Sequence, residues 1–275
     1  MDDKTPCEST FRRLHFAFVT DGNADQLLGI ASLLYNLITP SYKQSKPSPV
    51  WVLAPQFPVV QALKHLLALD LDIRYLRVAQ RDDDKYYIQM GLTGLFEVLD
   101  ERDTLVVLDY DHITLTRKGM PFHCLDSGVI VSSEISELPH LLGDSHTHPN
   151  ISLLWGRVRD LSAIAAKWHE AYEELVPLIS PRHRVEIAFG VAAQRARVDL
   201  KPCSIAIQAN FANPSLNTCI FHFGGETNES EQLKEHLRAY ARQFMASGER
   251  SLLETNDYLA RVLVDSLTQG PTTTT

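Results

Sequence analysis

Two carboxylates stand one residue apart at the end of an apolar run, where Asp109 and Asp111 follow Thr104–Leu108. The run has the length and the two valines of a strand that is covered by helices on both faces. In an open α/β sheet, ligands bind where the carboxyl ends of the strands point, so both acids are expected at a binding edge. Two carboxylates with this spacing can flank Mg²⁺ or Mn²⁺, with water and a phosphate oxygen as further ligands.

The spacing of the two acids does not by itself identify a metal site. An Asp-x-Asp pattern arises readily by chance in a long chain, and this sequence also has Asp70–Asp72 and Asp82–Asp84. Those two follow a helical pattern or lie in a polar run, where an exposed surface is the expected role. Only Asp109 and Asp111 end an apolar strand. The alternative for this pair is a solvated or helix-capping acidic turn.

Other residues that could do chemistry lie further along the chain. His222 ends an apolar run before two glycines, and a neutral imidazole there could be a third ligand beside two carboxylates or a structural histidine. Glu186 stands beside small apolar residues, which fits either a desolvated functional acid or an acid favoured near a helix start. His146 and His148 form a His-x-His pattern that could bind zinc, but their polar, proline-containing stretch is expected to be a loop.

The pattern before Asp109 predicts alternating strands and helices, which favours parallel strands joined by right-handed crossovers. Leu14–Val19 is expected to be the first strand, and Asn23 with Gln26 indicates a helix start after a polar turn. A strand, turn and helix of this kind open nucleotide-binding α/β units, although a plain connecting loop fits these residues equally. The other elements expected here are strands at Pro49–Leu53 and Ile73–Val78 and helices at Phe57–Leu69 and Tyr86–Leu99.

Beyond Asp111 the simple alternation stops. We expect short strands that could run antiparallel, then two helices separated by a break that begins at Pro181, then two final strands and two amphipathic helices. The strands and the first two helices are expected at Ile113–Thr116, Ser127–Ser132, Arg157–Leu178, Val185–Arg197, Ser204–Asn210 and Thr218–Gly225.

The predicted architecture is one α/β domain over 1–225 with a mostly parallel central sheet, helices on both faces and a small antiparallel element. A C-terminal helical extension over 226–268 is expected to pack on this domain, and 269–275 reads as a disordered tail. Two separate domains divided near Gly143–Asn150 would contradict this architecture.

Composition limits the class of protein. With 275 residues and 44% apolar residues the chain can bury a substantial core. A formal charge of −8 argues against sequence-independent nucleic-acid binding and against a polybasic membrane anchor. We expect a cytoplasmic protein, since no apolar run approaches the roughly 20 residues of a membrane span and no signal peptide is recognisable. The four cysteines form no Cys-x-x-Cys, which indicates reduced thiols.

Four segments in order resemble motifs of the retaining, nucleotide-sugar-dependent glycosyltransferases of family 8, the glycogenin-like group with the GT-A fold. Phe18–Asp21 resembles the nucleotide motif of the first strand, and Val107–Ile113 resembles the metal-binding Asp-x-Asp strand. Asp126–Val131 is similar to an Asn-Ser-Gly-Val segment near the donor sugar, with Asp in place of Asn. Ile220–Gly225 resembles the His-x-x-Gly segment.

The resemblance implies a GT-A-like hexosyltransferase that uses a UDP-sugar and retains anomeric configuration. It implies Mn²⁺ or Mg²⁺ bound by Asp109, Asp111 and His222, with a hydroxyl acceptor on a glycan, lipid or protein. The residues expected to hold the nucleotide are Thr20, Asp21, Asn23, Asp109 and Tyr110. The residues expected to face the donor sugar and its reacting carbon are Asp126 and Glu186.

Three departures from the family pattern keep other functions open. Glu226–Asn228 stands where the family has Lys-Pro-Trp, Ile187 stands where it has Gln, and the helix before the metal strand lacks a basic residue unless Arg81 or Lys85 replaces it. A sugar-nucleotide-binding protein without catalysis is therefore one alternative. A metal-dependent hydrolase that uses His146 and His148 is the other.

Overall fold

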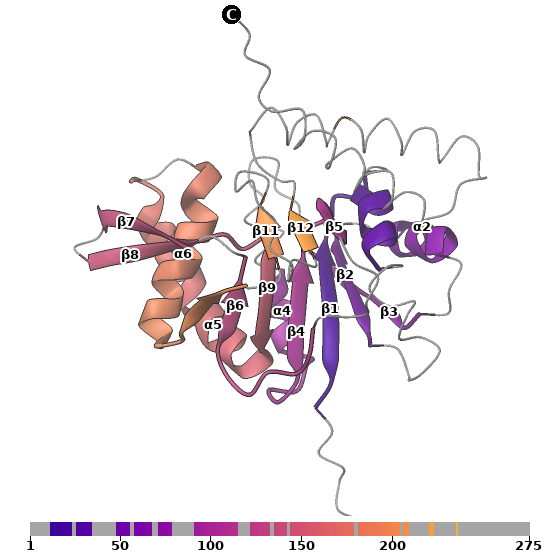
Figure 1. Ribbon diagram of the computed structural model, residues 1–275, viewed down its shortest axis with the longest axis horizontal. Coiled ribbons are helices and arrows are strands. Elements are labelled where there is room, and N and C mark those ends of the chain that lie inside the picture. The colour runs from indigo at the N-terminus through magenta and orange to yellow at the C-terminus, as the bar shows by residue number, and fades with distance from the viewer. Residues whose placement is uncertain are drawn as a thin grey trace, which may run out of the picture.

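The apolar run before Asp109 forms β4 (Thr104–Leu108), and all five of its residues are buried. In the computed structural model this strand lies in the middle of a seven-stranded sheet (Figure 1). In spatial order the strands are β10 (Leu200–Pro202), β6 (Val129–Val131), β9 (Leu153–Arg157), β4, β1 (Leu14–Val19), β2 (Val50–Ala54) and β3 (Ile73–Arg77).

The structure describes residues 12–23, 26–34, 48–55, 58–67, 71–78, 91–114, 122–132, 135–141, 144–178, 181–203, 206–208, 220–222 and 235. For residues 65–67, 113–114, 135–141, 144–148, 181–183, 206–208 and 220–222 it describes the backbone alone. The predicted helical extension over 226–268 lies outside this set, except for Glu235. The predicted tail over 269–275 and the first part of the helix predicted at Tyr86–Leu99 also lie outside it.

Parallel pairing of the first four strands of the chain is confirmed. β1 pairs in parallel with both β2 and β4, and β2 pairs in parallel with β3. Strand β9 runs antiparallel to β4 and β6, which lie on either side of it. Because β4 and β9 pair along their full length on the two sides of Gly143–Asn150, the chain is not divided into two domains there.

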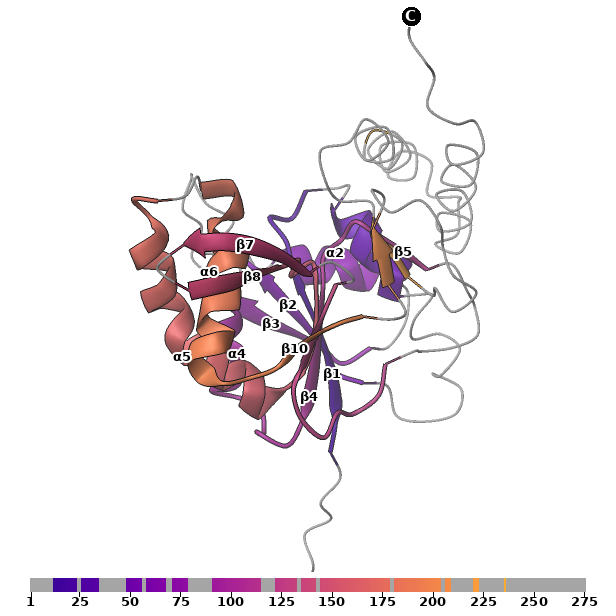
Figure 2. The same cartoon turned by 60° about the vertical axis from the view of Figure 1, so that its left-hand side comes forward.

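Alternate residues of the central strands face opposite layers, as the period of a strand requires. Ala17, Leu105 and Val107 face a core formed with α4 (Leu92–Phe96), α5 (Val158–Leu175) and α6 (Pro181–Ala196). Phe16, on the other face, meets the ring of Phe122 edge to face at 5.9 Å. Figure 2 shows α4, α5 and α6 on one side of the sheet and α2 (Pro58–Leu67) on the other.

Residues 26–34 are also helical and are called the first helix below. From Leu27 to Leu34 every residue is buried, and five of the eight side chains are apolar leucine or isoleucine. This continuous burial exceeds the one-sided stripe of an ordinary surface helix, so the first helix is enclosed by the fold.

Two smaller sheets accompany the main one. β5 (His112–Thr114) pairs antiparallel with β12 (Ile220–His222), which pairs in parallel with β11 (Ala206–Gln208). This three-stranded sheet stands above the carboxyl ends of β1 and β4 in Figure 1. β7 (Ile135–Leu141) and β8 (Asp144–Pro149) form a hairpin with a register shift between Leu138 and Leu141.

Two expectations about the later elements were wrong. Pro181 begins α6 instead of a break, and a proline fits the first turn of a helix because its missing N–H has no intrahelical partner there. The stretch around His146 and His148 is strand β8 and not a loop. Strands β7, β9 and β10 were not foreseen. In the described part of the chain, no helix combines the length and apolar character needed to cross a membrane.

Candidate functional site

Strand β4 delivers two acids into a braced turn at its carboxyl end. The Asp109 N–H donates to the carbonyl oxygen of Ser152 (2.9 Å), which ties the turn to the neighbouring chain segment. His112 Nδ1 lies 2.9 Å from the carbonyl oxygen of Asp109, and since a carbonyl only accepts, the ring donates here. Asp111 is 7% exposed and Asp109 is half-buried. The segment from Asp109 to Asp111, called the acidic turn below, is therefore held at both ends.

The end of β1 lies beside the acidic turn. The parallel register aligns Ala17 with Val107, so Thr20 and Asp21 leave the sheet at the same edge as Asp109. The turn after β1 and the acidic turn therefore lie at the same edge of the sheet. Ligands of open α/β sheets bind at such an edge.

The turn after β1, residues Thr20–Gly22, is held by one glutamine. The hydroxyl of Thr20 donates to Gln26 Oε1 (2.6 Å) and accepts from the Gly22 N–H (3.0 Å). Gln26 Oε1 also accepts from the Asp21 N–H (2.8 Å), and Gln26 Nε2 donates to Asp21 Oδ2 (3.3 Å). Thr20 is 2% exposed, whereas Asp21 is exposed. Thr20 thus shapes the turn, and Asp21 is the member that faces solvent.

The first helix begins directly after this turn. The Leu27 N–H donates to the carbonyl oxygen of Asn23 (2.9 Å), which places Asn23 at the helix start as predicted from the sequence. In a capping box the side chain of Gln bonds to the backbone of the residue that starts the helix. Gln26 instead bonds through its side chain to Asp21 and Thr20. Gly22 has φ +89°, and a Cβ there would lie 2.7 Å from Val59 Cγ2. A side chain at Gly22 is therefore excluded by both conformation and space.

Strand pairing brings His222 next to the acidic turn. In the β5–β12 ladder His222 is the register partner of His112, the residue that follows Asp111. Directly opposed residues of antiparallel strands have Cα atoms about 4.5–5.5 Å apart. The backbone of His222 is thus a neighbour of the acidic turn despite its distance in sequence.

The donor set at this edge fits a hard or borderline divalent cation. Carboxylate oxygens suit Mg²⁺ and Mn²⁺, and imidazole is an acceptable further ligand for Mn²⁺. Asp111 is 7% exposed, and His112 Nδ1 lies 4.0 Å from its Oδ1. Among the side chains that the structure describes, no three His, Cys, Asp or Glu residues converge on a metal position. The third expected ligand, His222, is described by its backbone alone.

The structure does not place Asp126 with the other predicted site residues. Asp126 precedes β6, and it forms an ion pair with Arg12, which precedes β1. Arg157 Nη1, at the end of β9, donates to the Asp126 carbonyl oxygen (2.8 Å). These partners lie at the amino ends of β1 and β4, opposite to the acidic turn. The Arg12 guanidinium also lowers the pKa of Asp126 below its usual range. Asp126 therefore lies outside the site at the carboxyl edge.

Asn150 and Ser152 lie at the carboxyl edge of the sheet, beside the acidic turn. Ser152 accepts the Asp109 N–H, and its own N–H donates to Asn150 Oδ1 (3.0 Å). The Ser132 N–H, at the end of β6, donates to the Asn150 carbonyl oxygen (3.1 Å). These contacts hold Asn150 in place two residues before Ser152, whose carbonyl oxygen accepts from the acidic turn. The signal that could have found it is the short apolar run Leu153–Trp155, which begins a strand directly after Asn150 and Ser152.

Tyr110 and Glu186, two further predicted site residues, are both half-buried. Tyr110 lies between the two acids, half-buried, and its backbone faces the first helix at Gly29. Glu186 lies near the start of α6 and is half-buried. Its contact with a donor sugar remains a prediction. Glu226–Asn228, which replaces the family's Lys-Pro-Trp, lies outside the described residues.

The histidines of the hydrolase alternative lie elsewhere. His146 and His148 belong to β8, where they pair with Leu138 and Ser136 of β7. The hairpin stands away from β5 and β12, as both Figure 1 and Figure 2 show.

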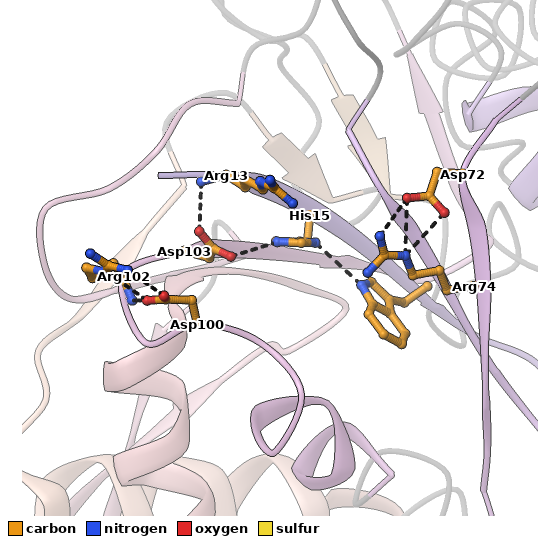
Figure 3. Close-up of polar contacts among 8 residues, drawn as sticks. Arg13, His15, Asp72, Arg74, Asp100, Arg102 and Asp103 are labelled. Carbon is orange, nitrogen blue, oxygen red and sulfur yellow. Dashed lines mark hydrogen bonds and ion pairs between the residues drawn. The ribbon is translucent and has the colours of Figure 1, made fainter. Parts of the chain in front are cut away.

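A second group of acid and histidine lies at the amino ends of the same strands (Figure 3). Asp103 Oδ2 is 2.9 Å from His15 Nε2, and Asp103 Oδ1 accepts the Arg13 N–H (2.8 Å). Trp51 Nε1 donates to His15 Nδ1 (3.4 Å), and since an indole can only donate, neutral His15 carries its proton on Nε2. Burial lowers the pKa of His15, although Asp103 opposes this effect. Asp103 and His15 are 7% and 3% exposed, so this group is a closed internal network.

Comparison with solved structures identifies the fold. The chain is similar to the galactosyltransferase LgtC in complex with donor and acceptor sugar analogues, with TM-score 0.54 and 12% identity over 83% of this chain and 95% of that one. A structure of an active-site mutant of LgtC gives TM-score 0.53 and 13% identity over 82% and 95%. The sequence matches no protein-family model and no curated protein. The chain therefore has the mixed α/β fold of GT-A glycosyltransferases, as the sequence predicted.

Proposed function

We propose that this protein is a glycosyltransferase that moves a hexosyl group from a nucleotide diphosphate sugar, specifically a UDP-sugar, to a hydroxyl acceptor with Mn²⁺ or Mg²⁺. The observation that carries the proposal is the meeting of three elements at one sheet edge. They are the acidic turn, the Thr20–Gly22 turn and the β12 backbone at His222. The fold shared with a galactosyltransferase supports the proposal.

The nucleoside end of the donor is assigned to the turn after β1. Asp21 is exposed there, and its carboxylate is oriented by Gln26 Nε2. A carboxylate accepts hydrogen bonds from the N–H or hydroxyl groups of a nucleoside. Asn23 at the start of the first helix adds the favourable end of the helix dipole for a phosphate.

The diphosphate end is assigned to Asp109, Asp111 and His222, which would hold the metal ion. When bound, the ion would act as a Lewis acid and neutralise the charge that develops on the leaving diphosphate, a contribution of several kcal/mol to catalysis. The part of the protein is to hold both carboxylates in place before the donor arrives. The hydrogen bonds from the Asp109 N–H to Ser152 and from His112 to the Asp109 carbonyl oxygen hold the backbone of the acidic turn, from which both carboxylates extend.

The sugar end is assigned to Asn150 and Glu186. Asn150, fixed by the Ser152 N–H, replaces Asp126 as the residue that hydrogen-bonds a donor hydroxyl. Glu186 would stabilise the positive charge at the anomeric carbon. In the reaction, the bond from this carbon to the diphosphate oxygen breaks and a bond to the acceptor oxygen forms, and the proton of the acceptor hydroxyl passes to the leaving diphosphate. Retention of configuration is part of the proposal because of the family resemblance of the motifs.

A thermal-shift panel with nucleotides and nucleotide sugars, with and without Mn²⁺, tests the proposal. A ligand at a hundred times its Kd stabilises the folded state by about 2.7 kcal/mol. UDP with Mn²⁺ is expected to raise Tm, and Asp111→Asn is expected to abolish the rise. No shift with any nucleotide at millimolar concentration would contradict the proposal.

An assay for free hexose released from UDP-sugars then distinguishes catalysis from binding alone. In this assay water takes the place of the unknown acceptor. A protein that binds UDP-sugars with Mn²⁺ and releases no hexose to water or to any hydroxyl acceptor would be a sugar-nucleotide-binding protein. Metal titration of His222→Ala and His146→Ala tests the ligand set. If only His146→Ala weakened metal binding, the site at the carboxyl edge would be wrong.

A further inference from the structure

The first helix touches both halves of the proposed donor site. Its residue Gln26 holds the turn after β1, and its residue Gly29 lies against the backbone of Tyr110 in the acidic turn. We propose that this helix sets the spacing between the nucleoside end and the diphosphate end, with Gln26 and Gly29 as positioning residues. The proposal rests on the proposed function and extends it to residues that contact neither reacting atoms nor metal.

The contact at Gly29 is too close for any side chain. A Cβ at this position would lie 2.5 Å from the Tyr110 carbonyl oxygen and 3.3 Å from its carbonyl carbon. Both atoms belong to the backbone of the acidic turn, so neither can rotate away. A methyl group at Gly29 must displace either the acidic turn or the first helix.

Glycine at position 29 is unfavourable for the helix itself. Alanine is the better helix former, and Gly29 adopts no positive φ that would require glycine. The residue is therefore explained by the close approach to Tyr110 and not by local conformation. Local choices that oppose the local structure are expected at functional sites.

The first helix cannot slide to relieve a change at Gly29. Leu28, Ile30 and Leu34 are each 0% exposed, so the helix is packed on all sides. Well-packed interiors transmit a displacement instead of absorbing it. Three hydrogen bonds connect Gln26 to Thr20 and Asp21, so a shifted helix would also move the turn that carries Asp21.

The affinity of a donor that contacts both turns depends on the spacing between them more than the affinity of a ligand that contacts one turn does. UDP with Mn²⁺ would engage Asp21 and the acidic turn together, whereas uridine would engage only the turn with Asp21. A spacing held in advance reduces the cost of binding a ligand that bridges two sites. Disturbing the spacing should therefore weaken UDP with Mn²⁺ selectively.

The experiment is calorimetric titration of UDP with Mn²⁺, and separately of uridine, into the wild type, Gly29→Ala and Gly94→Ala. Gly94 is a matched control, because it is also a helical glycine and its Cβ would meet only the side chain of Leu76, with Cδ2 nearest at 3.2 Å. Gly29→Ala is expected to weaken UDP with Mn²⁺ at least tenfold and uridine less than twofold. Gly94→Ala is expected to change neither. Equal weakening of both ligands, or none, in Gly29→Ala would overturn the proposal.

Gln26→Met tests the other part of the proposal, that the first helix holds the turn after β1. It removes the bonds to Asp21 and Thr20 at similar volume, and it is expected to weaken uridine and UDP alike, at least fivefold, without changing the affinity for Mn²⁺ alone. Unchanged uridine affinity in Gln26→Met would overturn the role of Gln26. If the wild type bound neither UDP nor uridine, the proposed function itself would be wrong. That result differs from one in which the wild type binds both ligands but the variants weaken them in the wrong proportion.

Discussion

At the amino end of β4, Asp103 lies beside His15; at the carboxyl end, Asp111 precedes His112, whose register partner is His222. Residue types are nearly the same at the two ends. At the amino end, His15, Asp103, Arg13 and Trp51 bond to one another in a buried network. At the carboxyl end, the acids lie on a turn at the edge where the turn after β1 and the β12 backbone at His222 also lie.

The comparison indicates that the role of a cluster of acid and histidine depends on which end of the sheet it occupies. The amino-end acids have basic partners, as the pairs of Asp103 with His15, Asp100 with Arg102 and Asp126 with Arg12 show. Parallel strands direct ligands to their carboxyl ends. We therefore assign stability to the amino end of β4 and donor binding to its carboxyl end.

Asp111→Asn should give the largest effect. In the proposed site this carboxylate is a metal ligand, and a loss of several kcal/mol of metal assistance would correspond to about a thousandfold in turnover. Turnover of a UDP-sugar measures the effect, and denaturant unfolding checks that stability is kept. Turnover within tenfold of the wild type would contradict the assignment of donor binding to the carboxyl end of β4.

Asp103→Asn should show the reverse behaviour. The amide cannot accept from both the Arg13 N–H and His15 as the carboxylate does, and a buried group left unsatisfied costs about 1–3 kcal/mol. We expect the free energy of unfolding to fall by about 2 kcal/mol, with turnover of the folded protein unchanged. A tenfold loss of turnover at full stability would show that the amino end participates in function.

Two glycines with positive φ allow the amino and carboxyl edges of the sheet to be compared. Gly22 (φ +89°) lies at the carboxyl edge and Gly128 (φ +81°) near the amino edge. Gly128→Ala should cost about 1–2 kcal/mol of stability from the strained backbone. Gly22→Ala should cost more, because its Cβ would also lie 2.7 Å from Val59 Cγ2. Only Gly22→Ala should also raise the Kd for UDP, because it moves the turn with Asp21. Denaturant unfolding and UDP titration give both quantities, and equal effects on UDP binding would contradict the comparison.

The amino-end network should make stability depend on pH. Burial lowers the pKa of His15 from its ordinary value of 6.5, so the unfolded chain takes up this proton at a higher pH than the folded chain. The stabilising contribution is thus complete above about pH 6.5 and is lost as pH falls below it, with a slope of at most about 1.4 kcal/mol per pH unit. Urea unfolding between pH 5 and 7 measures the slope, which should flatten in His15→Asn. An unchanged slope in that variant would exclude His15 as the source.

Asp126→Ala should give the smallest effect. Its ion pair with Arg12 is exposed, and such pairs contribute little to stability. We expect no measurable change in Tm, UDP affinity or turnover. A loss of turnover would return Asp126 to the donor site and displace Asn150.

The sequence predicted the first half of the sheet well because its apolar runs are bounded by polar turns. Leu14–Val19 is confirmed as a strand with the predicted bounds, and the apolar run Leu105–Leu108 is confirmed within β4. Strand β9 was missed because Leu153–Arg157 continues into α5 without a turn, so the run resembles the start of the helix. The β7–β8 hairpin is polar in sequence, which hides its strands.

The place of Asp109 and Asp111 after a buried strand could be predicted, but their neighbours in space could not. Asp109 and Asp111 are marked by the strand that they follow. Asp126 was chosen for its resemblance to a motif, and only strand pairing reveals that it lies at the opposite end of the sheet from Asn150. The roles of Gln26 and Gly29 depend on contacts between distant segments, which no local pattern records.

The pairing of β1 with β4 has a consequence for synthesis. Leu14 aligns with Thr104, and β4 in turn needs β9 on its other side. At about 5–20 residues per second, roughly 5–20 s pass on the ribosome between the emergence of β1 and of β4. During this interval the apolar segment Leu14–Val19 has no β4 partner, and unpaired strand edges favour aggregation. Slower initiation, which keeps nascent chains apart, should therefore raise the yield of folded protein.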